Sequence, residues 1–440
     1  MLKQKFYLLL SLMFLSAVAV AQRPQIEFTE FTLDNGLHVI LHEDNTTPNV
    51  VVNIMYHVGA KNEHPERTGF AHFFEHLMFE GSKHVDRGEF DRIVESSGGA
   101  SNAFTSFDVT NYYVFLPSNQ LELGLWLESE RLLHPKIDST GIATQKSVVT
   151  EEMKQTRDNQ PYGRWLVETI SRAFTVHPYR SDVLGQDAHI RAATDEEIMA
   201  FHNMFYVPDN AVLVIAGDIN KDETRVLVER YFGDIPRGRH DIFRPDVVEP
   251  VRRHEVRDTI FDNVQLPMIV QAYHIPAQGT EDFYAMEMLG ALLSQGQSSR
   301  LYRRLVVEDQ TAMVVEAIPL GLEDPGLSII LALPNMGVDP KTLEDGINAE
   351  LENVRNNLIT ETELQKLKNQ FESRLVNSNT TIASRATNLA NYHTLYGNAD
   401  LINTELERYH AVTREDIRRV AREYMREDNR VVLYILPGAN

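Results

Sequence analysis

Residues 194–209 read TDEEIMAFHNMFYVPD, and residues 413–428, 219 positions later, read TREDIRRVAREYMRED. In each copy a Thr followed three residues later by an acid can cap a helix, and apolar residues then recur at helical spacing. Each copy ends in Asp and is followed by Asn and a run rich in Val, Leu and Ile, which is typical of a β-strand. Because twice 219 nearly fills the 440 residues, the sequence predicts two similar halves.

The domain boundaries follow from this repeat. A polar, charged, Pro-containing stretch begins near Pro236 and has no regular period, which indicates a linker. We expect an N-terminal domain over residues 22–237, a linker over 238–258 and a C-terminal domain over 259–440. The predicted fold class is α+β, with two homologous α/β-roll domains, antiparallel-rich sheets flanked by helices, facing each other across the linker.

Individual elements follow from apolar periodicity and turn signals. Asp34-Asn35-Gly36 between two apolar runs predicts a hairpin of 27–31 with 37–41. Further strands are expected at 50–58, 102–116 (one or two strands), 264–275 and 327–333. Helices are expected at 69–79, 119–133, 140–158, 282–293, 341–356, 362–376 and 382–396.

Composition excludes several classes of protein. The formal net charge of −21 repels nucleic acid, so nucleic-acid binding is not expected. The charge is typical of an ordinary soluble acidic protein, and a field that attracts basic peptides is the alternative. The chain has no cysteine, which excludes disulfides and thiolate metal sites. Any metal must therefore be held by His, Asp or Glu.

The first residues indicate export. Lys3 and Lys5 precede an uncharged apolar run over 6–20, and Ala19-Val20-Ala21 supplies the small residues that a signal peptidase recognises. We expect a signal peptide over residues 1–21, secretion across the inner membrane and a periplasmic location. The run is short for a membrane span of about 20 residues, and no stable span is expected after its removal. A retained N-terminal anchor is the alternative.

His72-Phe73-Phe74-Glu75-His76 carries the chemistry. His72, Glu75 and His76 share one helix face, and two imidazoles one turn apart can coordinate one zinc ion. The carboxylate can then lie beside the water of the metal, which is the H-x-x-E-H arrangement. The alternative is a pair of hydrogen-bonded core histidines. A catalytic zinc site also needs a third protein ligand, and local spacing does not identify it.

At this point the sequence resembles the insulinase/pitrilysin metallopeptidases, the inverzincins. Their zinc motif is similar to HFFEHLMFEGS at 72–82, and the resemblance covers essentially the whole mature chain. The short bacterial two-domain type, similar to the subunits of mitochondrial processing peptidase, fits best. Further family motifs are matched by NAFT at 102–105, TNYY at 110–113, VVTEE at 148–152, and HPY at 177–179 with Gly185.

The resemblance implies the remaining site residues. The third ligand of the family is the second Glu of the pair that ends VVTEE, which is Glu152 here, with Glu151 as the adjacent alternative. His72, His76 and Glu152 would hold one zinc ion, and Glu75 would take the proton of the water and pass it to the leaving amine. The implied function is a zinc endopeptidase that hydrolyses peptides or unfolded protein segments.

The family also implies where substrate binds. An extended peptide adds to an edge strand that corresponds to residues 101–107, so Asn102, Ala103 and Phe104 are the substrate-binding candidates. Gln145 stands where the family often has a supporting Glu.

The chain departs from the family in its second half. The positions 219 residues after His72, Glu75 and His76 are occupied by Ala291, Ser294 and Gln295. These residues do not form a zinc-binding set, so no second zinc site is expected in the second half. Self-sufficient members carry an Arg and a Tyr, seven residues apart, after S-S-R-L; here Val306 and Met313 stand in those positions. A homologous second subunit that supplies the pair is therefore expected, and otherwise a homodimer. A non-catalytic assembly subunit and a metal-storage protein are the competing hypotheses.

Overall fold

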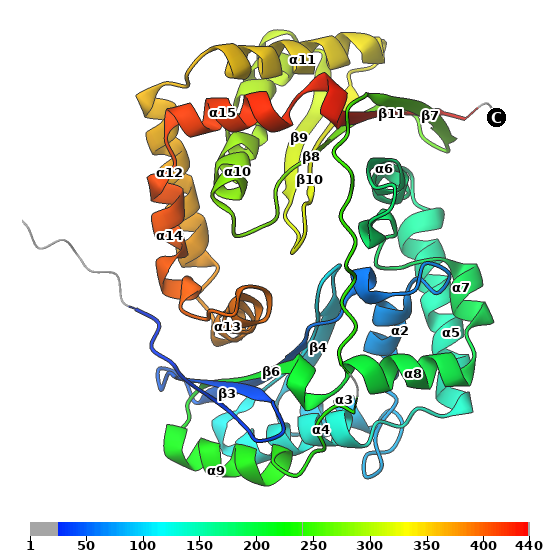
Figure 1. Cartoon of the computed structure of the whole chain (residues 1–440), viewed down its shortest axis with the longest axis vertical. Helices are drawn as coiled ribbons and strands as arrows, with labels where there is room; N and C mark the ends of the chain where they lie inside the picture. The colour runs from blue at the N-terminus through cyan, green and yellow to red at the C-terminus, as the bar shows by residue number, and fades with distance from the viewer. Residues whose placement is uncertain (1–24, 240, 439–440) are drawn as a thin grey trace, which may run out of the picture.

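The computed structural model describes residues 25–239 and 241–438. Figure 1 shows the first half of the chain in the lower part of the molecule and the second half above it. The expected signal peptide over 1–21 lies outside the described residues. Among the described residues, none of the helices combines the length and apolar character needed to cross a bilayer.

Each half contains one mixed sheet. The first has six strands in the order β1-β2-β6-β3-β5-β4, and the second has five in the order β7-β11-β8-β10-β9. The strands of the first sheet are β1 Thr29–Thr32, β2 His38–Glu43, β3 Asn49–Tyr56, β4 Ala100–Thr105, β5 Thr110–Pro117 and β6 Ala211–Gly217. Those of the second are β7 Val256–Asp262, β8 Met268–His274, β9 Ala312–Leu320, β10 Leu327–Pro334 and β11 Arg430–Pro437.

The two sheets have the same topology. Strands β2 to β6 correspond in order and pairing to β7 to β11, and β1 is an added edge strand. The last strand of each half lies parallel to the first strand of the unit and antiparallel to the second. The expected hairpin is the antiparallel pair β1–β2, and the region 102–116 forms two strands, β4 and β5.

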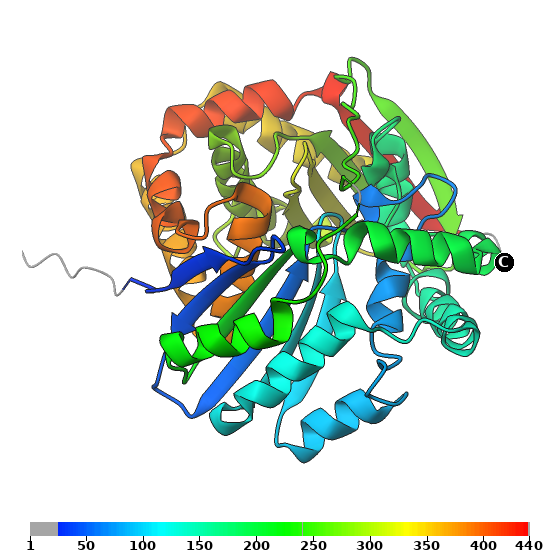
Figure 2. The same cartoon turned by 60° about the horizontal axis from the view of Figure 1, so that its bottom comes forward.

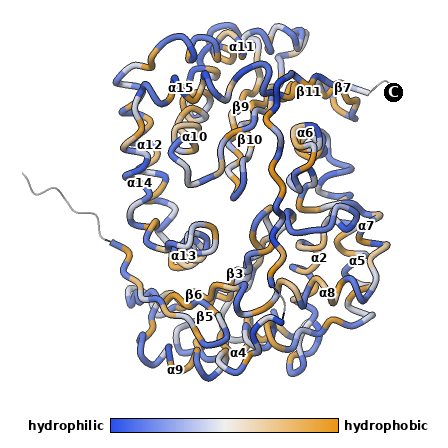
Figure 3. The backbone as a smooth tube through the Cα atoms, viewed as in Figure 1, coloured by the Kyte–Doolittle hydropathy of each residue, from blue (hydrophilic) through white to orange (hydrophobic). Residues whose placement is uncertain are grey.

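Helices flank both sheets, which confirms the α+β fold class. Those of the first half are α2 Phe70–Leu77, α3 Glu89–Ser96, α4 Leu121–Leu133, α5 Ser139–Met153, α6 Trp165–Ala173, α7 Asp187–Ala192, α8 Asp195–Phe205 and α9 Lys221–Phe232. Those of the second are α10 Glu281–Ser294, α11 Pro340–Asn356, α12 Glu361–Asn377, α13 Ile382–Tyr396, α14 Leu401–Ala411 and α15 Arg414–Tyr424. Figure 3 shows that strands such as β3 and β6 are largely apolar, whereas α11, α12 and α14 carry many polar residues.

The caps of two helices confirm the internal repeat. Thr194 begins α8 and Thr413 begins α15, and each forms a reciprocal capping box with the acid three residues later. Each helix leads through a short 3₁₀ turn into a central buried strand, β6 or β11. The same local sequence therefore builds the same local structure twice.

The halves exchange one helix each. Helix α6 of the first half packs on the second sheet, and α13 of the second half packs on the first sheet. The two helices are equivalent, because a shift of α6 by the repeat length places it within α13. In Figure 2 the first sheet lies between α4 and α9 in front and α13 behind. Ile170 and Ala173 belong to the same buried apolar cluster as Val270 and Leu433. Ala386 and Leu389 belong to the same cluster as Val51 and Val214.

The connecting segment is shorter than expected. The predicted linker end at residue 258 is wrong, because Val256 already pairs with Val431 in the parallel β7–β11 ladder. Strand β7 is an edge strand with mostly exposed or half-buried residues, so its sequence lacks the apolar pattern that marks a buried strand. From Arg237 to Glu255 the described residues form no helix or strand.

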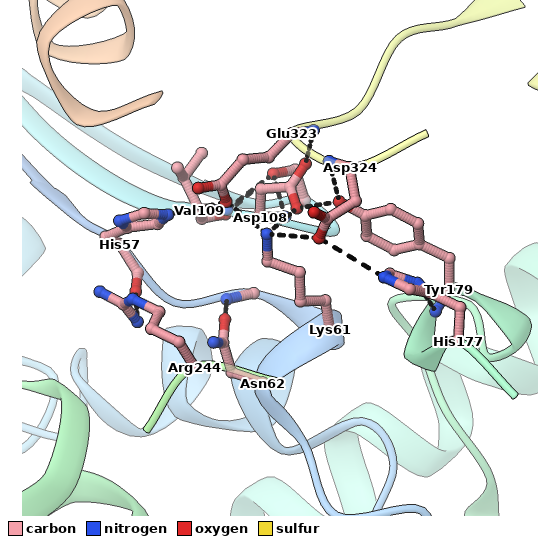
Figure 4. A network of polar contacts seen from close by, with 12 residues as sticks. His57, Lys61, Asn62, Asp108, Val109, His177, Tyr179, Arg244, Glu323 and Asp324 are labelled. Carbon is pink, nitrogen blue, oxygen red and sulfur yellow. Dashed lines mark hydrogen bonds and ion pairs between the residues drawn. The ribbon is translucent and has the colours of Figure 1, made fainter. Parts of the chain in front are cut away.

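An ion cluster around the buried Lys61 joins the halves beside this segment (Figure 4). The Lys61 ammonium lies 3.2 Å from Asp108 Oδ1 and 3.2 Å from Asp324 Oδ2, and it also contacts Glu323. Glu323 and Asp324 belong to the turn between β9 and β10, whereas Asp108 lies in the turn between β4 and β5. Tyr179 donates a hydrogen bond of 2.5 Å to Asp108. The end of β4 is thereby fixed to the second half.

Candidate active site

Helix α2 is anchored at its first turn. Glu63 accepts hydrogen bonds from the backbone N–H of Gly69 at 2.7 Å and of Ala71 at 2.8 Å, which satisfies donors that have no partner within the helix. Gly69 has φ +91°, and the backbone of Gly185 packs against it so closely that a Cβ on Gly185 would lie 2.3 Å from Gly69 N. Burial raises the pKa of Glu63. Sequence reasoning misses Glu63, because a capping side chain six residues before the N-cap Gly69 follows no fixed spacing rule.

The structure brings His72, His76 and Glu152 together. Glu152 Oε1 lies 3.7 Å from His72 Nε2, and Glu152 Oε2 lies 3.2 Å from His76 Nε2. One donor atom from each of the three residues lies within 4.8 Å of the others. The two imidazole rings are 4.8 Å apart and steeply inclined, at 80°. The histidines come from α2 and the carboxylate from α5, two helices that pack on each other.

The adjacent glutamate points elsewhere. The side chain of Glu151 is 56% exposed and lies 3.5 Å from Lys154 and 3.3 Å from Gln155, on the outer face of the helix. Gln145 donates a hydrogen bond of 2.6 Å to Glu80 and none to Glu152. The geometry therefore favours Glu152 over Glu151 in the cluster.

The protonation states of His72 and Glu152 suit a divalent cation. Burial and the neighbouring His76 lower the pKa of His72 to about 4, so its imidazole is neutral at neutral pH. The hydrogen bond with His76 lowers the pKa of Glu152 below its usual range, so the carboxylate is ionised. Neutral imidazoles and an ionised carboxylate are the forms that bind metals, and His₂Glu is a donor set of catalytic zinc sites. The three residues present therefore fit zinc.

Glu75 lies on the same helix and lines a cleft. Its Oε2 accepts a hydrogen bond of 2.6 Å from the hydroxyl of Thr105, at the end of β4. Burial raises the pKa of Glu75. The cleft has a volume of about 470 Å³ and is lined by Glu75, His76, Phe79, Asp91, Glu95 and residues 99–103.

The substrate candidates lie on the edge strand β4. Asn102 and Ala103 line the cleft beside Glu75 and His76. Phe104 does not line it, and its side chain is 38% exposed. One long edge of β4 pairs with β5, and the other has no strand partner in the sheet that the described residues form.

The second half has no equivalent cluster. Ala291 and Ser294 lie on α10, and Gln295 ends that helix. Among the described residues, no group of three metal-binding side chains lies wholly within the second half. Val306 lies in a π-helical segment, Tyr302–Glu308, and Met313 lies half exposed on β9.

Comparisons with known proteins identify the family of the chain. Residues 38–186 match the family described as Insulinase (Peptidase family M16), and residues 192–371 match the Peptidase M16 inactive domain. The zinc protease PqqE of Helicobacter pylori is 30% identical over 410 residues, which are 92% of each chain. The chain therefore belongs to the insulinase family of zinc proteases, peptidase family M16. Within it, the chain is of the bacterial type of about 440 residues and is similar to that H. pylori protease.

Solved structures show the same architecture. The crystal structure of a protease from Helicobacter pylori superposes with a TM-score of 0.90 at 28% identity, over 94% of this chain and 100% of that one. The periplasmic protease PqqL from Escherichia coli shares the fold with a TM-score of 0.77 at 18% identity. That match covers 94% of this chain and 48% of PqqL.

Proposed function

We propose that the chain is a zinc-dependent endopeptidase in which His72, His76 and Glu152 hold one zinc ion and Glu75 is the general base. The observation that carries the proposal is the arrangement of these donors, within 4.8 Å of one another, beside a half-buried Glu75 in a cleft. The substrates are peptides or unfolded protein segments, because a cleft against a strand edge admits an extended chain.

The residues of the site have distinct tasks. Zinc bound there would polarise the scissile carbonyl and make a water molecule more acidic. Glu75 takes the proton of the attacking water and delivers it to the leaving amine. Its raised pKa suits both steps, since a base with a pKa nearer neutrality also protonates the leaving group more readily. Thr105 holds the Glu75 carboxylate in one orientation through its hydrogen bond.

The edge strand positions the substrate in this proposal. An extended peptide would pair with the free backbone groups of β4, and Asn102 and Ala103 would contact it where they line the cleft. Phe104 would contact residues of the peptide further from the scissile bond, because its partly exposed ring lies outside the cleft lining.

A peptide-cleavage assay on the purified chain tests the function. Hydrolysis of an unstructured peptide is expected with zinc, should stop after a chelator removes the metal, and should return when zinc is added back. Cleavage that persists in a chain shown to contain no metal would refute a zinc peptidase.

We also propose that the active form is heteromeric. Val306 and Met313 stand where self-sufficient relatives carry an Arg and a Tyr near the substrate, so a homologous subunit would supply that pair. Weak activity alone and strong activity after co-expression with a homologous chain are expected. Full activity of the pure single chain would refute this part and leave the zinc site unaffected.

The proposed location is the periplasm. The N-terminal segment has the layout of a signal peptide, and the distantly similar PqqL is a periplasmic protease. Osmotic-shock fractionation of cells that express the full chain should release a product that begins after Ala21. A full-length product in the membrane fraction would instead support a retained anchor.

A further inference from the structure

A second group of metal-binding side chains lies far from the cleft. Glu30 on β1, His38 on β2 and His393 on α13 place one donor atom each within 4.8 Å of the others. His38 Nε2 lies 3.2 Å from Glu30 Oε2, and His393 Nδ1 lies 3.9 Å from the same oxygen. The two imidazole rings are stacked, with centroids 3.5 Å apart and planes inclined by 10°.

The spacing of these donors is close to that of the first cluster. In the first cluster the two histidine nitrogens lie 3.2 and 3.7 Å from the Glu152 carboxylate. In the second group they lie 3.2 and 3.9 Å from the Glu30 carboxylate, so the two sets of distances are similar. Donors about 2.1 Å from a tetrahedral zinc ion lie about 3.4 Å from one another, which falls inside this range. Because the two planes are now nearly parallel, the rings must turn out of the stack before their in-plane lone pairs can meet at one ion beside Glu30.

The surroundings of the histidines also suit a metal. Both histidines are half-buried, and their rings lie against each other in the stack. His393 Nδ1 is buried and makes no hydrogen bond to any described residue. His38 Nδ1 lies 3.1 Å from the Thr32 hydroxyl, and metal-bound histidines commonly use their second nitrogen in this way.

The position of the group gives it a structural consequence. Glu30 and His38 belong to the N-terminal hairpin of the first sheet, whereas His393 belongs to the helix that the second half lays across that sheet. We propose that Glu30, His38 and His393 form a second zinc site, separate from the catalytic one, that ties the hairpin to α13 and so joins the two halves. Three protein ligands leave one position for water, and the partial exposure of Glu30 gives an entry path.

Zinc stoichiometry tests this proposal. The full mature chain is stripped with a chelator, titrated with zinc against a chromophoric competitor, and checked by elemental analysis. The wild type should bind two equivalents, and His393→Ala and Glu30→Gln should each bind one. His76→Ala should also bind one, and the His76→Ala/His393→Ala double variant none. His254→Ala removes an exposed histidine of the connecting segment and should still bind two.

The outcomes separate the two sites. On the His76→Ala background, zinc should raise the melting temperature, and the rise should disappear when His393→Ala is added. If the wild type binds one equivalent that His76→Ala removes, or if both His393→Ala and Glu30→Gln retain two, the second site does not exist. Should His393→Ala fail to fold, the isosteric and exposed Glu30→Gln decides the matter. Loss of peptidase activity is not a readout here, so failure of the proposed function would leave this test intact.

Discussion

The hydroxyl of Thr105 donates a hydrogen bond of 2.6 Å to the carboxylate of Glu75. The bond runs from the end of the edge strand β4 to helix α2, so the strand proposed to bind substrate also orients the proposed base. The turn that follows Thr105 contains Asp108, which is held by Lys61 and Tyr179 at the junction of the halves.

Removal of this bond should lower the rate without loss of the metal. Thr105→Val keeps the volume and deletes the hydroxyl, and we expect kcat/KM to fall by about tenfold to a hundredfold, the value of one hydrogen bond to a charged group. Thr105→Ser keeps the hydroxyl and should retain most of the activity. Zinc content should match the wild type in both variants, and an unchanged rate in Thr105→Val would show that Glu75 needs no such support.

Glu75→Gln should separate chemistry from binding. The amide cannot accept the proton of water, so hydrolysis should fall by about 10²–10⁴-fold. His72, His76 and Glu152 are unaltered, so zinc should remain at the wild-type level. The comparison requires peptide turnover and elemental analysis on the same sample. Activity within tenfold of the wild type would exclude Glu75 as the base.

Two adjacent glutamates offer a matched pair for the third ligand. Glu152 faces both histidines, whereas Glu151 is largely exposed on the other side of α5. Glu152→Gln should weaken zinc binding at this site by at least about tenfold, and Glu151→Gln should leave it unchanged. Competition with a chelator of known affinity measures both. The reverse ranking would move the ligand to Glu151.

Lys61 should contribute strongly to stability. Its side chain is only 5% exposed and compensates Asp108, Glu323 and Asp324, which come from both halves. Lys61→Met would leave these carboxylates without their main cation, at a cost of roughly 3–5 kcal/mol, and the thermal midpoint should fall by several degrees. Lys341→Met removes an exposed lysine paired with Asp345 and should cost less than about 1 kcal/mol. Equal midpoints for the two variants would show that the ion cluster around Lys61 does not stabilise the fold.

Glu344 should contribute a pH-dependent part of the stability. Burial alone would raise its pKa, but hydrogen bonds from Arg257 and Tyr434 lower that pKa to about 2, from 4.5 in an unperturbed group. The stabilisation is therefore complete above about pH 4.5 and is lost as the pH falls toward 2. Glu344→Gln should melt at a lower temperature than the wild type at pH 7, with a difference that shrinks below pH 4. Glu352→Gln, on the exposed face of the same helix, should show no such trend.

The sequence predicted the parts of the site that are set by local geometry. His72, Glu75 and His76 share one helix, and the i, i+3, i+4 spacing alone places them on one face. Glu152 could be assigned only through resemblance to the family, because the packing of α2 on α5 is a tertiary contact. No spacing rule joins Glu30 and His38 to His393, so that group becomes visible only in the structure.

For the fold, too, the local elements could be predicted from the sequence, whereas some of their tertiary packing could not. The repeat indicated the two halves, and most strands and helices lie where the apolar periodicity placed them. The start of β7 was missed because an edge strand with charged residues such as Arg257 has no apolar signature. The sequence also could not show which sheet α6 or α13 covers, because an apolar helix face does not identify the surface on which it packs.

The exchange of α6 and α13 bears on the ancestry of the chain. One half cut out alone would leave an apolar sheet face bare and would offer its own helix to a second copy. Two copies of such a unit would satisfy each other as a domain-swapped homodimer. The present chain has the form of such a dimer after gene fusion, in which the segment from Arg237 to Glu255 connects the two copies. Among the described residues, the group proposed to hold the catalytic zinc lies wholly in the first half, so changes in the second half need not alter it.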